Sequence, residues 1–498
     1  MKIKIKQQLS SPSKTDIDAS KQLILLLPEA ISKGKWPTVA YKKELANRVS
    51  SSSKSTKSWS LDLPNSNATQ VNFATVTAEI SQFDLLTLAR KLVSAQLKGN
   101  PNQLSVAMPG LPAKLVTRIA DALLNAIFAA SAEMPSFKSK KSPASKLKTV
   151  LLYNQKTKFD SKAVEARAAG NTLARQLTAL PPNELTPGIY HKKVAKLAKQ
   201  HGWKMQFHNM ASLRKQKAGA FVAVAQASVE NDAGILHLRY TPKKATKKAA
   251  CALVGKGICF DTGGTNLKPA NYMLGMHEDM QGSAVALGTF LALSELKVDF
   301  PVDCWLALAQ NHIGPKAYKQ NDVVTASNGT SIEVMHTDAE GRMVLADTLV
   351  FAAKKKPALI IDYATLTGCC VVALGTNYSG AFTNRDGLHA DIIQAGKDSG
   401  ERVWPFPIDA DYDEDLESKI ADTKQCTVSG GPDHIQASRF LQLFVDDTPW
   451  CHVDLSAGNH KGGLAHISTD YTGFGVGFTL DLLLDKKVLD KPKILSKN

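Results

Sequence analysis

Apolar runs and helical patterns alternate along the second half of the chain. Three short apolar runs are typical of strands: ACALVG at 250–255, VDCWLALAQ at 302–310 and ALIID at 358–362. Apolar patterns typical of helices follow two of these strands, at 282–296 and at 342–356. Repeated strand–loop–helix order indicates a largely parallel sheet that is flanked by helices. In such sheets, functional side chains collect in the loops at the carboxyl ends of the strands.

The length of the chain predicts more than one domain. It has 498 residues, beyond the size at which a single hydrophobic core stops growing. Helical spacing at 83–98 and 111–130 indicates that residues 1–150 form a small N-terminal α/β domain. Residues 151–498 are expected to form a larger C-terminal α/β domain around a central, mostly parallel sheet. The polar residues with distinctive chemistry all lie in this second domain.

Positive charge is concentrated in the first half. The net charge of +16 is divided into +26 for residues 1–250 and −10 for residues 251–498. This asymmetry leaves two interpretations open: a lysine-rich solvated surface, or a DNA-binding or regulatory protein. No apolar run approaches the ~20 residues that cross a bilayer, and polar residues follow the basic start where a signal peptide would be apolar. We therefore expect a cytoplasmic protein without membrane contact.

Three glycine-rich polar segments lie within 90 residues of one another. They read VGKGICFDTGGTNLKP at 254–269, MHEDMQG at 276–282 and HTDAEGR at 336–342. Taken singly, each charged side chain in them is more often an ordinary surface charge. Taken together, they supply four carboxylates and three cations: Asp261, Asp279, Asp338 and Glu340, with Lys256, Lys268 and Arg342.

The charge of these carboxylates favours a metal site. Four carboxylates in one pocket repel, and several would bind protons unless cations neutralise them. Two divalent ions match four negative charges, and a carboxylate-bridged metal pair can activate water. Nearby metal cations can also lower the pKa of a lysine enough for its neutral amine to act as a ligand.

The three segments resemble signatures of the leucine aminopeptidase (cytosol aminopeptidase) family. These signatures are VGKG-x-x-FD-x-GG-x-x-LKP, EDM-x-G-x-A and TDAEGR-x-x-LAD, and nearly every fixed position is matched here. DYATLTGCCVVALG at 362–375 and NELTP at 183–187 add to the resemblance, which covers residues ~165–485. It implies a catalytic domain at 151–498 and a hydrolase that removes N-terminal residues from peptides.

The resemblance also implies a role for each charged residue. Lys256, Asp261, Asp279 and Glu340 would hold one divalent metal tightly, and Asp261, Asp338 and Glu340 would hold a more exchangeable one. Zinc or manganese is the expected metal. Lys268 would stabilise the developing oxyanion, and Arg342 would hold a bicarbonate that carries a proton.

Substrate contacts and assembly are implied in the same way. Met276, Thr365 and Gly368 fall where the family lines its side-chain pocket, and Leu366 would offer a backbone carbonyl to the peptide. An ordinary packing role is the alternative for these four residues. The expected partners are peptides with a free N-terminus, and the expected assembly is a homohexamer.

Three positions depart from the family pattern. His336 precedes TDAEGR where asparagine is usual, His277 replaces the usual lysine before EDM, and DLSAG near Asp454 replaces the more common D-x-AG. These changes can alter substrate preference or the affinity for the second metal. We expect His336 to make hydrogen bonds beside the metal site rather than to be a ligand.

Overall fold

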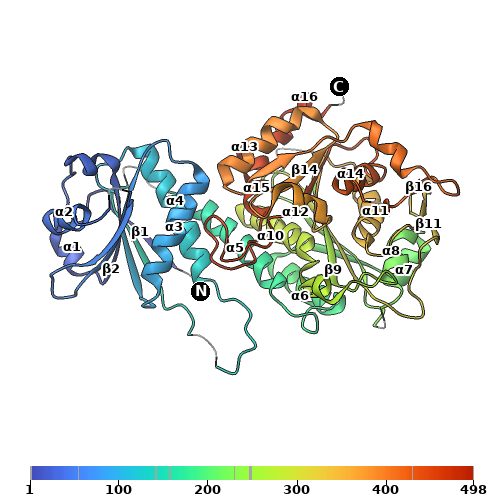
Figure 1. Ribbon diagram of the computed structural model, residues 1–498, viewed down its shortest axis with the longest axis horizontal. Coiled ribbons are helices and arrows are strands. Elements are labelled where there is room, and N and C mark those ends of the chain that lie inside the picture. The colour runs from blue at the N-terminus through green and yellow to red at the C-terminus, as the bar shows by residue number, and fades with distance from the viewer. Residues whose placement is uncertain are drawn as a thin grey trace. The chain divides into compact units, whose positions relative to one another are not determined.

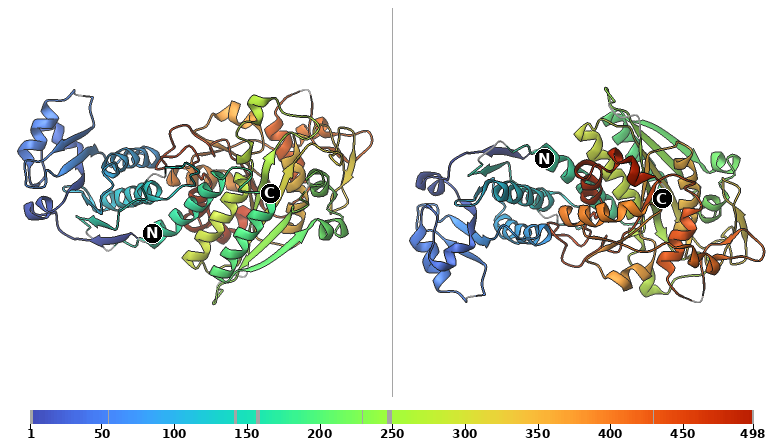
Figure 2. Two further views of the ribbon diagram at one scale, coloured as in Figure 1. Left: turned by 90° about the horizontal axis from the view of Figure 1, so that it is seen from below. Right: turned by 90° about the horizontal axis from the view of Figure 1, so that it is seen from above.

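The computed structural model describes residues 3–53, 55–140, 143–155, 159–228, 230–245, 250–428 and 430–496. Within this range the chain forms two compact units. The first comprises Met1–Ala168 and Gly462–Asp470, and the second comprises Ala169–Lys461 and Tyr471–Asn498. Both are built from a sheet with helices on its two faces (Figures 1 and 2).

The first unit contains a six-stranded sheet in the order β1-β6-β5-β2-β4-β3. All neighbouring strands are parallel except β3 and β4. The strands are β1 (Lys4–Gln7), β2 (Gln22–Pro28), β3 (Ser58–Asp62), β4 (Gln70–Val76), β5 (Gln103–Ala107) and β6 (Thr149–Leu152).

Both faces of this sheet are covered. Alternate residues of β2 point to opposite faces, so the continuous apolar run Leu23–Leu27 is buried throughout. Ile24 and Leu26 pack with α3 (Gln82–Leu97) and α4 (Ala113–Ser131). On the other face the core includes residues of α1 (Lys14–Asp18) and α2 (Lys42–Ser50).

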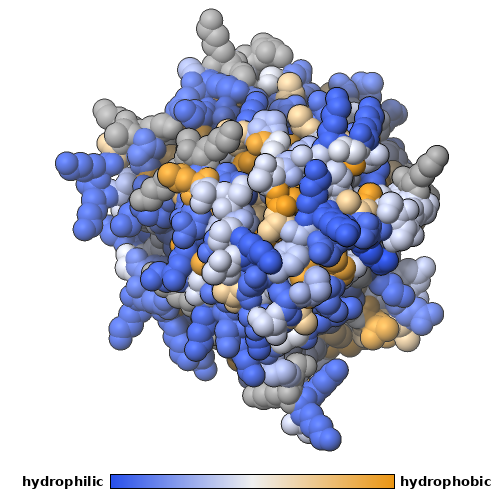
Figure 3. Space-filling model, turned by 90° about the vertical axis from the view of Figure 1, so that its left-hand side faces the viewer, coloured by the Kyte–Doolittle hydropathy of each residue, from blue (hydrophilic) through white to orange (hydrophobic). Residues whose placement is uncertain are grey.

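The surface of the first unit is mainly hydrophilic. Figure 3 shows polar side chains over most of this face, with apolar residues in small separate groups. Among the unit's described residues, Leu9 and Phe137 are the exposed large apolar side chains. Polar side chains, many of them lysines, that are spread over a face in this way are typical of a solvated surface.

The second unit contains an eight-stranded sheet in the order β15-β14-β17-β13-β9-β10-β8-β7. Its centre, β17-β13-β9-β10, is parallel, and antiparallel pairs lie toward both edges. The strands are β7 (Lys204–Asn209), β8 (Gly234–Tyr240), β9 (Cys251–Asp261), β10 (Val302–Asn311), β13 (Leu359–Ala364), β14 (Ser379–Thr383), β15 (Val403–Pro405) and β17 (Trp450–Asp454). A small second sheet contains β11 (Val323–Thr325), β12 (Ser331–Glu333) and β16 (Thr423–Lys424).

Two helices pack against opposite faces of the central strand β9. On one face, Gly255 lies so close to α10 (Gln281–Leu296) that an added Cβ would meet the Gly282 carbonyl oxygen at 2.4 Å. On the other face, Ala252 and Val254 share a core with α11 (Glu340–Ala353), α8 (Gly219–Ala225) and α14 (Asp433–Gln442). Lys256 follows the same alternation, so its side chain points to the α11 face.

The elements predicted from the sequence are present. The predicted strands correspond to β9, β10 and β13, and the helices at 282–296 and 342–356 correspond to α10 and α11. The helices expected at 83–98 and 111–130 are α3 and α4. The predicted α/β class with a mostly parallel central sheet is confirmed. None of the helices in the described ranges is both long and apolar enough to cross a membrane.

Candidate metal and peptidase site

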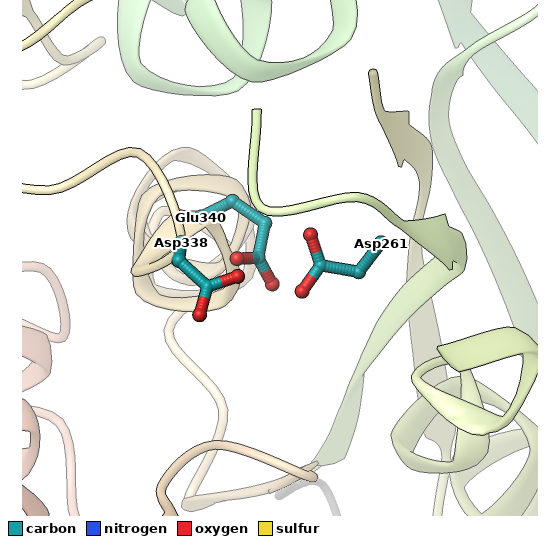
Figure 4. A group of neighbouring side chains, drawn as sticks. All are labelled: Asp261, Asp338 and Glu340. Carbon is teal, nitrogen blue, oxygen red and sulfur yellow. The ribbon is translucent and has the colours of Figure 1, made fainter. Parts of the chain in front are cut away.

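The charged residues come from strand β9 and from the turns that lead into α10 and α11. Asp261 ends β9, and Asp279 follows a short 3-10 turn, η2 (Met276–Glu278). Asp338 lies just before α11, and Glu340 is its first residue, where the positive end of the helix dipole favours a carboxylate. In Figure 4 the carboxylates of Asp261, Asp338 and Glu340 converge on one point.

These three carboxylates could hold a metal ion. Each offers an oxygen, and the three oxygens all lie within 4.8 Å of one another. Asp279 joins them through Lys256, whose Nζ lies 2.7 Å from Asp279 Oδ1 and 2.9 Å from Glu340 Oε1. The sequence-predicted set Lys256, Asp261, Asp279, Asp338 and Glu340 is therefore brought together.

Lys268 lies at the other side of this carboxylate cluster. Its Nζ is 2.9 Å from Asp261 Oδ2 and 2.5 Å from Asp338 Oδ1. The loop that carries it turns at Gly263, whose φ of +84° favours glycine. A Cβ at Gly263 would also lie 2.9 Å from Asp338 Oδ1, so glycine lets the loop approach the cluster closely.

Burial and mutual repulsion raise the pKa of three of the carboxyls. Burial places the pKa of Asp279 well above its usual range and also raises that of Glu340. Burial together with the charge of Asp261 raises the pKa of Asp338 to about 6. Ionisation of these carboxyls is unfavourable in the fold, so bound cations would strongly stabilise their ionised form.

The pKa values of the two lysines are raised as well. Burial alone would lower the pKa of Lys256, but Asp279, Glu340 and Asp261 outweigh it. The same balance holds for Lys268, where Asp261 is the strongest opposing charge. The protein's own charges thus keep both side chains as ammonium groups. Lys256 can act as a neutral ligand only when metal cations add positive charge beside it.

The residues present fit a divalent metal site. Asp279 Oδ2 and Glu340 Oε2 are buried and have no hydrogen-bond partner within the described ranges. Unpaired buried carboxylate oxygens are costly unless a cation binds them. Carboxylate oxygens with one amine nitrogen are suitable donors for zinc or manganese.

A cavity of about 910 Å³ opens onto these residues. It is lined by all five predicted metal ligands, by Lys268 and Arg342, and by the four predicted substrate residues Met276, Thr365, Leu366 and Gly368. Thr365 also contacts the cluster directly, since its Oγ1 donates to Asp279 Oδ1 at 2.7 Å and its carbonyl accepts from Lys256 Nζ at 3.0 Å. All eleven residues that the sequence analysis predicted for the site therefore line one cavity.

The catalytic-domain model of the cytosol aminopeptidase family matches residues 172–480 of the chain. The chain belongs to the cytosol aminopeptidase family. A probable cytosol aminopeptidase from Acidovorax sp. (strain JS42) is 42% identical over 330 residues, which cover 66% of this chain and 65% of that protein. One from Synechococcus sp. (strain JA-3-3Ab) is 40% identical over 326 residues, which cover 64% and 63%. The matched region therefore spans slightly less than two thirds of these relatives.

A solved structure of the family has the same architecture. A tomato leucine aminopeptidase mutant matches this chain with a TM-score of 0.85 and 28% identity. The match covers 97% of each chain.

The residues at the three departures from the family pattern each make defined hydrogen bonds or close contacts. His336 Nδ1 accepts a hydrogen bond from the Asp338 backbone N–H at 3.3 Å, and burial lowers the pKa of its ring. His277 Nε2 lies 3.3 Å from the Tyr471 hydroxyl. Asp454 accepts from the Leu366 backbone N–H at 3.0 Å and so fixes the loop that carries the substrate residues.

Several supporting residues were not predicted. Asn311 Nδ2 donates to Asp261 Oδ1 at 2.8 Å and to the Thr337 carbonyl at 2.9 Å. Its position at the end of the buried strand β10 could have identified it, because neighbouring parallel strands end at the same edge. Asp433, which pairs with Arg342, and Gln425, which binds the backbone of His336, lie in a segment without any pattern that marks them.

Proposed function

We propose that this member of the cytosol aminopeptidase family is a metallo-aminopeptidase that removes N-terminal residues from peptides. One observation carries the proposal: four carboxylates and two lysines converge on a single cavity, with two buried carboxylate oxygens left unpaired. Two divalent ions, zinc or manganese, would be held by Lys256, Asp261, Asp279, Asp338 and Glu340. When bound, such ions polarise a carbonyl and make water more acidic.

The protein's own side chains position the substrate and stabilise charge. Lys268 is an ammonium group beside Asp261 and Asp338, so it can stabilise the oxyanion that develops from the scissile carbonyl. Met276, Thr365, Leu366 and Gly368 line the same cavity, which supports a role for them in contacting the N-terminal residue. Removing one such oxyanion-stabilising group costs ~10²-fold or more in kcat.

The proposed metal site also predicts a requirement for a free N-terminus. A free α-amine has a lone pair that would ligate one of the two ions and so orient the substrate, whereas the lone pair of an acetylated amine is delocalised into the amide. We therefore expect hydrolysis of leucyl-p-nitroanilide in the presence of manganese and no cleavage of the N-acetylated form. Efficient cleavage of an acetylated peptide would overturn the exopeptidase assignment.

Metal content tests the two-ion arrangement independently. Elemental analysis of protein saturated with zinc or manganese should give two ions per chain, and a single ion at saturation would contradict the proposal. The relatives' names place them in the cytosol, and we propose the same location for this chain. A homohexamer remains a prediction that sedimentation analysis can test.

A further inference from the structure

The guanidinium of Arg342 already binds a carboxylate of the same chain. Arg342 lies in the first turn of α11, and its side chain is 2% exposed. Its Nη2 donates to Asp433 Oδ1 at 2.8 Å, and its Nη1 donates to the Gln425 carbonyl at 3.1 Å. Both terminal nitrogens of the guanidinium are thus engaged by the protein.

Asp433 is placed to act in the cavity rather than only to pair with Arg342. It is the first residue of α14, it lines the cavity, and its side chain is 31% exposed. One oxygen is fixed by Arg342, and Oδ2 makes no hydrogen bond to another described residue. A partly exposed carboxylate with one anchored oxygen can accept and release a proton through the other.

This arrangement does not fit the bicarbonate that the family resemblance places at Arg342. A free anion would have to displace Asp433 from the guanidinium, or lie beside it as a second negative charge. The internal carboxylate also needs no binding from solution, because the fold already holds it at the site.

We infer that Asp433 is the proton-transfer carboxylate of this enzyme and that catalysis needs no bicarbonate. The inference rests on the proposed aminopeptidase function. The attacking water gives one proton to Asp433 as its oxygen bonds to the scissile carbonyl carbon. Protonated Asp433 then gives this proton to the leaving amine nitrogen as the C–N bond breaks. Arg342 holds the carboxylate in place during both transfers.

Two variants of Asp433 separate an internal from an external carboxylate. Asp433→Asn keeps the size of the side chain and a hydrogen-bond acceptor for Arg342, but its amide cannot take the proton. Asp433→Ala removes the carboxylate and leaves space for an anion from solution beside Arg342. We expect both to lose ~10²-fold or more in kcat, the scale of general acid–base catalysis. Millimolar bicarbonate should restore activity to Asp433→Ala alone, whereas the wild type should keep full activity in buffer freed of carbon dioxide.

A matched control is an ion pair that involves another residue of the same helix. Asp413 pairs with Arg439 of α14 and lies outside the residues that line the cavity. Asp413→Asn therefore removes a similar arginine-paired carboxylate and should keep kcat within twofold of the wild type.

Anion binding gives a second readout that does not depend on turnover. Calorimetric titration with bicarbonate should show binding to Asp433→Ala and none to the wild type. Bicarbonate binding to the wild type, loss of wild-type activity without carbon dioxide, or full kcat in Asp433→Asn would each overturn the inference. A wild type that cleaves no peptide at all would instead refute the proposed function, and the titration would still test which anion occupies Arg342.

Discussion

Gly341 controls how closely α11 approaches Lys256. It is the second residue of the helix, and an added Cβ would lie 2.7 Å from both Cε and Nζ of Lys256. Ordinary contacts of a Cβ begin at 3.4 Å, so Gly341→Ala requires a displacement of about 0.7 Å. Lys256 cannot swing into solvent, because it is 3% exposed and its Nζ is held by Asp279 and Glu340.

The displacement should therefore affect the metal cluster more than the fold. Alanine in place of glycine gains up to about 1 kcal/mol in a helix interior, and crowding of a packed site costs about 1–3 kcal/mol. The free energy of unfolding should then fall by at most about 3 kcal/mol. A misplacement on the order of 1 Å at catalytic groups costs about 10²-fold in rate.

Three measurements on Gly341→Ala test this reasoning. Thermal unfolding should remain cooperative, elemental analysis should show weakened metal retention, and kcat on leucyl-p-nitroanilide should fall by about 10²-fold. Gly314→Ala is the control, because its Cβ would meet its nearest atom, the Ala227 carbonyl oxygen, at 3.5 Å. A Gly341→Ala protein with wild-type kcat and metal content would refute the claim that Lys256 is held rigidly at the cluster.

Three other experiments test the remaining assignments. Lys268→Ala should lower kcat by ~10²-fold or more while metal content stays near wild type. Asp261→Ala should instead lose metal. Full kcat in Lys268→Ala would exclude the proposed role of Lys268. Because the pKa of Asp338 is raised to about 6 in the fold, its ionisation opposes folding of chelator-treated protein once the pH rises above the unfolded value near 3.8. Asp338→Asn should therefore raise the melting temperature of chelator-treated protein more at pH 8 than at pH 4, and an equal effect at both would contradict this. If the basic first half serves only solubility, duplex DNA binding should vanish at ~150 mM salt, and sub-micromolar affinity there would refute this interpretation.

Local pattern was sufficient to predict the central strands of the second unit and the two helices that pack against them. The apolar run at 250–255 lies within the observed strand β9, and the helical pattern at 282–296 differs from α10 by one residue at its start. Both signals are short-range, because strand and helix periodicities are set by residues close in sequence. The strand order and the antiparallel edges were not predictable in this way.

The chemical class of the site was also determined by the sequence. Acidic residues in glycine-rich loops after buried strands had to meet at one edge of a parallel sheet, and the structure brings them together around Lys256. Asn311 completes the same edge from β10, and only the register of β9 against β10 places its amide on Asp261.

What the tertiary structure alone decided is the environment of Arg342. Asp433 lies 91 residues away from it in a segment without a repeating pattern, and no local signal links the two. Their ion pair forms because α11 and α14 pack in the same core. A contact between residues this far apart in sequence depends on how helices pack rather than on the periodicity of the sequence. The sequence therefore determined that the site is acidic and suited to metal, and the packing of α14 decided which carboxylate faces its arginine.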